Sequence, residues 1–500
     1  MMLGQAVSIF VQFLGIIFVA RILGAASFGI LSIAYIPISL ATIAMNIGVN
    51  QALVKYISQY RFDDKPHIRR VLIETGIVIN VTVGIILTII TYFSSTFLAD
   101  SIFNQPELAP LIRLCSFTLL GQTLFNTANS ILIGYERMEL KSLIAILNSV
   151  LRSIAGPILV FLGYGAIGAV YGNVASILVA GLAGFIMVAI IWRSEPKKSE
   201  GFNNIECAKL MLLYGYPLFF SGLFSGITPN ITNFLLALCV SPTHIGNYQA
   251  ATRFGVLVTF FTVPISTVMF PLFSKLENQI DALRAVFIDS IKYLGIIIYP
   301  IIAVVIALAH EIISVLYGQG YPYAETYLKL SVLAFITIGL GSISTSNIIV
   351  IKNTRIIFSQ SLLNFALTIP LGIILIPRIG VPGLIISGII GSLPGFIYGL
   401  HWIKKKQHIS PDYTTAMKTI IAAAVSGFTT NLYTSTVQLN PWIKLIIGGT
   451  LFLITYITSI LLLRTLKHQD LNNLENITRD LPLSPTIKRV INLLRPLVTT

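Results

Sequence analysis

Long apolar runs alternate with short polar connections along almost the whole chain. A hydrocarbon core about 30 Å thick is crossed by about 20 apolar residues in a helix, and most runs approach or exceed this length. The polar alternation of a membrane β-barrel strand is absent, so the runs are predicted to be helices. The fourteen predicted spans are 3–20, 28–49, 75–99, 111–134, 143–163, 166–192, 210–240, 248–273, 293–309, 329–351, 356–376, 381–403, 416–436 and 441–463. The pattern therefore predicts an all-α integral membrane protein with about 14 transmembrane helices.

Four landmarks of the first half of the chain recur 215–217 positions later. The matching positions are Gly29 with Gly246, Arg113-Leu114 with Lys329-Leu330, Gly165 with Gly380, and Gly168 with Gly383. A nearly constant offset through unrelated surroundings predicts an internal duplication. Two fused copies of a membrane unit are the layout of a carrier, in which a site between the halves is exposed to each side in turn.

The duplication predicts five segments. Residues 1–192 and 210–403 form two six-helix lobes, and a charged cytosolic linker, 193–209, joins them. Because six is even, both lobes enter the membrane from the same side, and their symmetry axis lies along the membrane normal. Residues 404–463 add two transmembrane helices outside the duplication. The basic cytosolic tail, 464–500, is predicted either to lie as helices on the inner leaflet or to be disordered.

Composition and charge agree with a membrane location. Hydrophobic residues make up 55% of the 500 residues and charged residues only 10%, against about 25% charged in soluble domains. With both termini in the cytosol, 26 of the 33 lysines and arginines lie in cytosolic loops or the tail, as the positive-inside rule requires. The net charge of +14 is therefore a topology signal, and no nucleic-acid partner is expected because no basic domain exists to bind one. We expect a multi-pass monomer in the cell (cytoplasmic) membrane.

No motif for covalent chemistry is present. Residues Gly163 to Gly168 match G-x-G-x-x-G, but they join two membrane helices with no preceding strand, so we interpret them as a tight turn. Cys115, Cys207 and Cys239 are isolated, which indicates neither a disulfide framework nor a zinc site. We therefore expect no catalytic residue, no metal and no cofactor, and we do not expect an enzyme.

Amide side chains inside the spans recur at helical spacing, which places them on shared helix faces. Singly, each is explained as hydrogen-bonding glue between helices, worth about 0.6 kcal/mol a pair. As a set on several helices, they predict the lining of a hydrated cavity. The candidate lining residues are Gln122, Asn126, Asn129, Asn148, Asn230, Asn233, Gln249, Gln360 and Asn364, and Asn46 and Asn50 of the second span share the spacing.

Arg152 lies about ten residues into a span of 21, which is roughly 15 Å deep and near the bilayer midplane. Arginine at that depth costs about 2.5–3.5 kcal/mol on insertion scales, and no Asp or Glu lies deep in any predicted span. Two interpretations remain: Arg152 binds a ligand phosphate with its two-pronged guanidinium, or it is structural and satisfied by carbonyls and water. Arg253, nearer the outer edge, is either a second phosphate contact or a snorkelling side chain.

The same residues bear on the class of cargo. A carrier of cationic drugs is expected to hold a buried carboxylate that neutralises its cargo, whereas this chain offers buried arginine without one. The polarity favours an anion.

Several motifs resemble one family. Ala20-Arg21-Ile22-Leu23-Gly24, followed by Phe28-Gly29, is similar to the opening signature of polysaccharide biosynthesis flippases, which belong to the multidrug/oligosaccharidyl-lipid/polysaccharide (MOP) exporter superfamily. The other matching segments are Gly134 to Arg137, Ile245 to Ala251, Glu311 to Gly318 and Ile376 to Gly383. The resemblance covers roughly residues 1–463 and implies translocation of a polyprenyl-linked oligosaccharide whose phosphate or pyrophosphate is held in a cationic cavity.

The leading hypothesis is a flippase that carries an anionic polyprenyl-(pyro)phosphate-linked oligosaccharide from the cytosolic to the outer leaflet by alternating access. H⁺ or Na⁺ coupling stays open, because no coupling carboxylate is evident. The alternatives are a multispanning glycosyltransferase or polymerase that acts on the same lipid carrier, and a drug or cation antiporter of the same superfamily.

Overall fold

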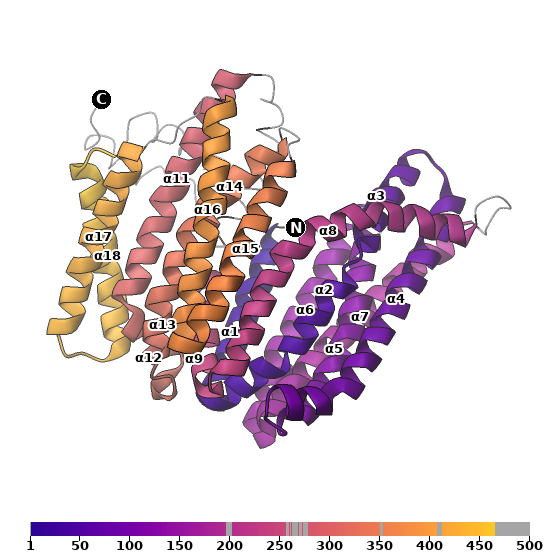
Figure 1. The fold of residues 1–500 in the computed structure, drawn as a ribbon, viewed down its shortest axis with the longest axis horizontal. Coiled ribbons are helices and arrows are strands. Elements are labelled where there is room, and N and C mark those ends of the chain that lie inside the picture. Colours follow the sequence, from indigo (N-terminus) through magenta and orange to yellow (C-terminus); the bar gives the residue numbers. More distant parts are fainter. Residues whose placement is uncertain are drawn as a thin grey trace. The chain divides into compact units, whose positions relative to one another are not determined.

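The computed structural model describes residues 2–196, 203–256, 279–350, 354–407 and 413–465, together with positions 260, 262, 269 and 273. Every regular element in these residues is a helix (Figure 1). Nine helical stretches of the described residues are long and apolar enough to cross a membrane. Large apolar side chains such as Phe93, Phe161 and Ile190 are exposed, as lipid-facing positions require. The chain is thus a multi-pass membrane protein, and the fourteen spans and cytosolic termini stay predictions.

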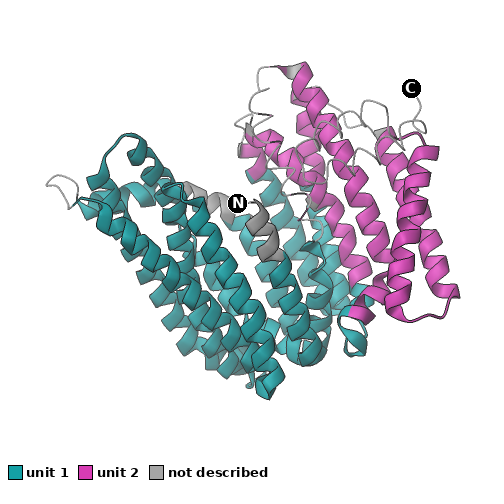
Figure 2. Ribbon diagram, turned by 180° about the vertical axis from the view of Figure 1, so that it is seen from behind, with its two compact units in different colours: residues 1–256, 316–327, 358–395 teal, residues 257–315, 328–357, 396–500 magenta. Residues whose placement is uncertain are grey.

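The chain divides into two compact units (Figure 2). Unit 1 comprises Met1–Val256, Leu316–Tyr327 and Phe358–Gly395, and unit 2 comprises Leu257–Val315, Leu328–Ile357 and Phe396–Thr500. Unit 1 therefore takes in segments that belong to the second half of the sequence. The predicted lobes, linker and tail stay predictions. They were drawn from the repeat in the sequence, whereas the two units are defined by contacts within the fold.

Unit 1 carries the residues of interest. Its helices are α1 (Met2–Ala34), α2 (Ile36–Met45), α3 (Val49–Phe62), α4 (Pro66–Phe97), η1 (Leu98–Ile102), α5 (Leu108–Gly134), α6 (Met138–Leu159), η2 (Val160–Tyr164), α7 (Gly165–Ser194), α8 (Asn204–Cys239), α9 (Pro242–Thr252) and η3 (Gly318–Gly320), with most of α15 (Thr354–Ile379) and α16 (Val381–Gln407). Helix α7 packs against α5 and α6, while α1 packs against both α6 and α9. A core that includes Leu53, Ile57, Leu72, Ile131 and Ile144 fills the space among α3, α4, α5 and α6.

Unit 2 is built around α11 (Ile280–Ala307). It also holds most of α12 (Ala309–Leu316) and the second half of α13 (Ala324–Ser331), together with η4 (Val332–Ala334), α14 (Phe335–Val350), α17 (Tyr413–Thr436) and α18 (Pro441–Leu462). The α17–α18 hairpin, which lies outside the predicted duplication, packs on α11. Phe452 and Tyr456 of α18 are buried there, and the Tyr456 hydroxyl donates to the Ile296 carbonyl at 2.8 Å.

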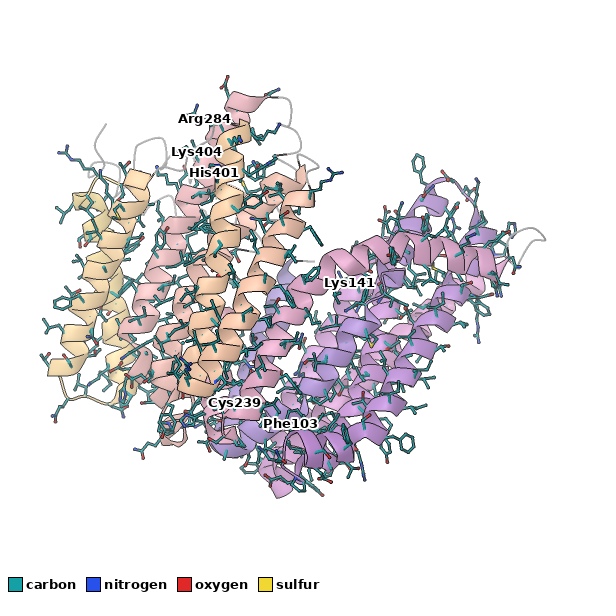
Figure 3. The ribbon with its side chains drawn as sticks, viewed as in Figure 1. Phe103, Lys141, Cys239, Arg284, His401 and Lys404 are labelled. Carbon is teal, nitrogen blue, oxygen red and sulfur yellow. The ribbon has the colours of Figure 1, made fainter. Side chains whose placement is uncertain are left out.

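Labelled side chains mark the ends of each unit. In unit 1, Lys141 lies towards one end of the bundle, whereas Phe103 and Cys239 lie at the other (Figure 3). In unit 2, Arg284, His401 and Lys404 share one end (Figure 3). The basic residues labelled at these ends belong to loops that the charge count assigns to the cytosol.

The repeated glycines meet in the structure in a reciprocal way. A Cβ on Gly29 of α1 would overlap the carbonyl oxygen of Pro242, and a Cβ on Gly246 of α9 would overlap that of Ala25. Because Ala25 and Gly29 correspond to Pro242 and Gly246 at an offset of 217, each copy presents the same positions to the other. Such self-complementary contact is the signature of a two-fold relation. We refer to this contact as the glycine seam.

The second repeated pair has the same backbone conformation in both copies. Gly165 has φ +55° and Gly380 has φ +62°, a left-handed region that favours glycine. Gly163 also has a positive φ, +93°, so the G-x-G-x-x-G segment forms the turn between η2 and α7.

Candidate functional site

The two arginines singled out from the sequence lie close together in unit 1. Arg152 projects from α6 and Arg253 follows the last residue of α9, and both helices pack on α1. Their guanidinium groups interact electrostatically with each other, and Arg152 also interacts with the Tyr35 hydroxyl. Two like charges at short range repel, so the pair creates a strongly cationic point in the unit.

Neither arginine is neutralised by the described part of the chain. Arg152 is exposed, and no described residue forms a hydrogen bond or ion pair with its side chain. The Nε atom of Arg253 is buried without a hydrogen-bond partner. A buried, unpartnered guanidinium N–H is costly, which marks this position as one where a ligand or water completes the hydrogen bonding.

Residues adjacent to each arginine in the sequence contact α1 and so hold the backbone at both positions. The Ser153 hydroxyl donates to the Val11 carbonyl at 2.8 Å, and the Gln12 amide donates to the Ser149 hydroxyl at 2.7 Å. These bonds hold α6 against α1 on either side of Arg152. Next to Arg253, the Phe254 ring packs edge-on against Phe13 with centroids 5.9 Å apart.

Helix α9 ends at Thr252, and Arg253 is the residue that caps its C-terminus. The residues 253–254 form a turn before helical structure resumes. Carbonyls at a helix C-terminus carry partial negative charge and favour a cation there. The Tyr317 hydroxyl donates to the Ala250 carbonyl at 3.2 Å in this last turn and interacts electrostatically with Arg253. Burial raises the pKa of Tyr317.

A cavity of about 380 Å³ lies in unit 1, and one of its lining residues, Tyr35, interacts electrostatically with Arg152. It is lined by Tyr35, Ile38, Ser39, Thr42, Ile43, Asn46, Gln122, Gly226 and Asn230, from α2, α5, α8 and the α1–α2 junction. The Thr42 hydroxyl donates to the Ile38 carbonyl at 2.8 Å, and its oxygen lies 3.3 Å from the Gln122 side-chain oxygen, which brings α2 next to α5 at the cavity wall. Of the predicted lining residues, the cavity brings together Gln122 and Asn230.

Loop 316–327 reaches α1 and α9 through polar contacts. The buried Tyr321 hydroxyl donates to the Ala20 carbonyl at 2.6 Å, and the Tyr323 backbone N–H donates to the Asn247 side chain at 3.0 Å. His244 Nδ1 lies 2.7 Å from the Tyr327 hydroxyl. This segment thereby connects Ala20 in α1 to His244 and Asn247 in α9.

Several known proteins are similar to this chain. A family described as polysaccharide biosynthesis protein matches residues 18–324, more than half of the chain. The chain belongs to this family. The matched region contains both arginines, the cavity and the loop 316–323.

Full-length relatives agree with the family. The chain is similar to the probable low-salt glycan biosynthesis flippase Agl15 of Haloferax volcanii, 21% identical over 472 residues that cover 93% of this chain and 94% of Agl15. Its fold is similar to that of the lipid II flippase MurJ in an inward closed conformation, with a TM-score of 0.76 and 18% identity over 91% of this chain and 97% of MurJ. An inward-facing multidrug resistance MATE family transporter of the MOP superfamily also matches, with a TM-score of 0.66 and 18% identity over 79% of this chain and 94% of that one. The family that the sequence motifs resemble, polysaccharide biosynthesis proteins, is confirmed.

The other predicted lining residues do not share one cavity, and their contacts differ. Gln360 donates to the Gly395 carbonyl at 2.9 Å and so joins α15 to α16, while Asn364 accepts from Thr368 one turn along α15. The Gln360 contact is of the interhelical kind that was the alternative to a cavity lining, whereas the Asn364 contact stays within one helix. The carbonyl oxygens of Asn129 and Asn148 are buried without a hydrogen-bond partner. The remaining three, which are partly buried and make no side-chain hydrogen bond to the described residues, are Asn126, Asn233 and Gln249.

Three polar residues of the cavity were missed from the sequence: Tyr35, Ser39 and Thr42. A signal was present, because Ser39, Thr42 and Asn46 follow at i, i+3 and i+7 and therefore share one helix face. Asn80 was missed too. Its amide is buried and donates to Asn50 at 2.9 Å and to Thr127 at 3.0 Å, which links α4 to α3 and α5.

A buried ion pair was also missed. Glu195, just after α7, accepts two hydrogen bonds from Arg69 of α4, each 2.9 Å long, and one from the Tyr135 hydroxyl at 2.7 Å. The side chains of Arg69 and Glu195 are only 12% and 7% exposed. Burial and the adjacent Glu195 carboxylate raise the pKa of Tyr135. We call this arrangement the Glu195 network.

Proposed function

We propose that this protein is a flippase that moves an anionic polyprenyl-(pyro)phosphate-linked oligosaccharide from the cytosolic to the outer leaflet by alternating access. The single observation that carries the proposal is the pair Arg152 and Arg253. The two guanidinium groups interact with each other, and no carboxylate of the described residues pairs with either. The names of the glycan biosynthesis flippase Agl15 and the lipid II flippase MurJ support it.

A pyrophosphate suits this pair for electrostatic reasons. Each guanidinium presents N–H groups in a fork that matches two phosphate oxygens. A dianionic group placed between two repelling cations converts an unfavourable interaction into two favourable ones, and it supplies the acceptor that Arg253 Nε lacks. The lining amides would hydrate or bind the rest of the head group, while the polyprenyl chain stays in the bilayer.

The direction of transport has an electrical consequence. Moving negative charge outward is favoured by an inside-negative potential, at about 2.3 kcal/mol per charge per 100 mV. The proposal includes two six-helix lobes (1–192 and 210–403), fourteen spans and cytosolic termini. It also includes a monomer in the cytoplasmic membrane, and it leaves the coupling ion unassigned.

The family resemblance is to transporters, so the chain is a transporter rather than an enzyme. A cation antiporter of the same superfamily is the second candidate, since the MATE fold matches as well. It needs a carboxylate free to meet its cargo. Among the described residues, Glu195 is buried but held by Arg69, and Glu311 of α12 is buried but does not line the cavity. The observations therefore favour the anionic cargo.

The test is export of lipid-linked glycan by cells that carry defined variants. We expect Arg152→Ala to abolish export and Arg152→Lys to restore little of it, since a lysine lacks the fork. Arg253→Ala should reduce export strongly. Arg378→Ala is the matched control, because Arg378 is an exposed arginine at the end of α15. Equal membrane levels of all variants establish insertion, and normal export by Arg152→Ala would remove the site assignment.

A further inference from the structure

The cavity lined by Tyr35 offers uncharged hydrogen-bonding groups of the kind that bind carbohydrate. Its polar lining consists of three hydroxyls and three amides, and the other lining residues are two isoleucines and a glycine. No charged side chain belongs to this lining. Cavities that bind small molecules have volumes of about 300–1,000 Å³, and this one, at about 380 Å³, falls in that range.

Several lining groups retain hydrogen-bonding capacity. The Gln122 side-chain oxygen lies 3.3 Å from the Thr42 hydroxyl, whose proton goes to the Ile38 carbonyl, and the Gln122 amide N–H groups make no bond to the described residues. Asn230 and Asn46 each donate to a carbonyl of their own helix, at 2.8 and 3.2 Å, and their side-chain oxygens stay available. A sugar hydroxyl both donates and accepts, so a ring with several hydroxyls complements such mixed groups better than an apolar or purely anionic ligand does.

Tyr35 connects the cavity to the arginine pair. It lines the cavity, accepts a hydrogen bond from Asn173 at 2.5 Å, and interacts electrostatically with Arg152. A phosphate held by Arg152 would therefore lie on the Tyr35 side of the cavity. The group attached directly to that phosphate is the one that the cavity would receive.

We propose that this cavity binds an uncharged sugar ring attached to the phosphate that Arg152 and Arg253 hold. The inference rests on the proposed function and adds the class of the first sugar. A sugar acid is disfavoured, because burying a carboxylate among neutral groups costs more than burying a hydroxyl. The cavity thus selects the sugar nearest the lipid, while sugars further along the glycan are left to other contacts.

Gly226 offers a way to fill the cavity without disturbing the fold. It lines the cavity on α8, and a Cβ added there meets no atom within 4 Å. Gly226→Leu would therefore place its side chain in the open space, and leucine favours a helix more than glycine does. Gly388→Leu on α16 is the matched control, because a Cβ at Gly388 also meets nothing within 4 Å and Gly388 does not line the cavity.

The experiment compares two probes by titration calorimetry on the purified full-length protein: a short-chain polyprenyl diphosphate, and the same diphosphate esterified to glucose. The parent should bind the glucosylated probe about tenfold more tightly, the gain expected from one or two net hydrogen bonds. Gly226→Leu should lose this preference and keep its affinity for the bare diphosphate, whereas Gly388→Leu should keep both. Gln122→Met, which removes the amide at similar volume, should reduce the preference.

Three outcomes are informative in different ways. Equal binding of both probes by the parent, or an unchanged preference in Gly226→Leu, would overturn the sugar assignment and leave the flippase proposal intact. A glucuronosyl probe that binds as tightly as the glucosyl one would refute the selection of an uncharged ring. Undiminished binding of the bare diphosphate by Arg152→Ala would instead refute the phosphate site on which the inference rests.

Discussion

Replacing Glu195 with glutamine tests how much one buried ion pair contributes to this membrane protein. The carboxylate accepts three hydrogen bonds, two from Arg69 and one from Tyr135. Glutamine keeps one acceptor oxygen, but its NH₂ group then faces an Arg69 N–H, and the guanidinium stays buried without a counter-charge. Removing one partner of a buried pair costs about 3–5 kcal/mol, and we expect about 3 kcal/mol for Glu195→Gln and about 5 kcal/mol for Glu195→Ala.

The matched control is Glu139→Gln. Glu139 pairs with Arg137 at 3.5 Å, but these side chains are 61% and 63% exposed. An exposed pair is screened by water and salt and contributes about 0–1 kcal/mol. The measurement is the free energy of unfolding in micelles during denaturant titration, at low and high salt.

The double variant Arg69→Met/Glu195→Leu sharpens the test. Because an apolar pair avoids the cost of burying two charges, it should be more stable than either single charge-breaking variant. The reasoning is refuted if Glu195→Gln and Glu139→Gln lose similar stability, or if the double variant is the least stable of the set.

Three further predictions follow from other parts of unit 1. Gly29→Ala and Gly246→Ala should each destabilise the protein by about 1–3 kcal/mol, because each new Cβ overlaps a backbone oxygen of the glycine seam. Gly388→Ala, with open space around it, should be neutral or stabilising. Equal unfolding temperatures in all three variants would contradict the close packing at the glycine seam. Tyr321→Phe should cost about 0.5–1.5 kcal/mol by removing the buried hydrogen bond to the Ala20 carbonyl. The loss should be seen as faster hydrogen exchange around Ala20 in α1, whereas Tyr323→Phe, whose side chain is exposed, should leave exchange there unchanged. The pKa of Tyr135 is raised in the folded state. Its neutral form therefore contributes stability below about pH 10, and this contribution is lost at higher pH. Tyr135→Phe should flatten the alkaline part of a stability–pH curve, and parallel curves for variant and parent would argue against this assignment.

The helical fold could be predicted because its signal is local. Apolar runs of sufficient length give helices wherever the backbone must satisfy its own hydrogen bonds in lipid, and glycines such as Gly165 and Gly380 mark turns through their positive φ. The division into units could not be predicted in this way. Loop 316–327 belongs to unit 1 through contacts such as Tyr321 with Ala20, which join residues 301 positions apart.

The candidate site was predictable only in part. Arg152 stood out because a lone charge within an apolar run is costly, and Gln122 and Asn230 stood out as amides. Hydroxyl residues gave a weaker signal, since Ser39 and Thr42 satisfy themselves on carbonyls of their own helix and are tolerated in any span. Glu195 was overlooked because its partner, Arg69, lies 126 positions away and looks like an ordinary basic loop residue in the sequence.

The reciprocal meeting of Gly29 with Pro242 and of Gly246 with Ala25 has an evolutionary consequence. The predicted duplication implies a half-length ancestor that formed a homodimer. In such a dimer, residues 25 and 29 of both subunits would have met, so one glycine codon would have encoded both sides of the contact. The predicted duplication would have separated that codon into two independently mutable ones. A replacement in either copy would then be met by a change in its partner alone, so the two halves of the contact could come to differ in sequence.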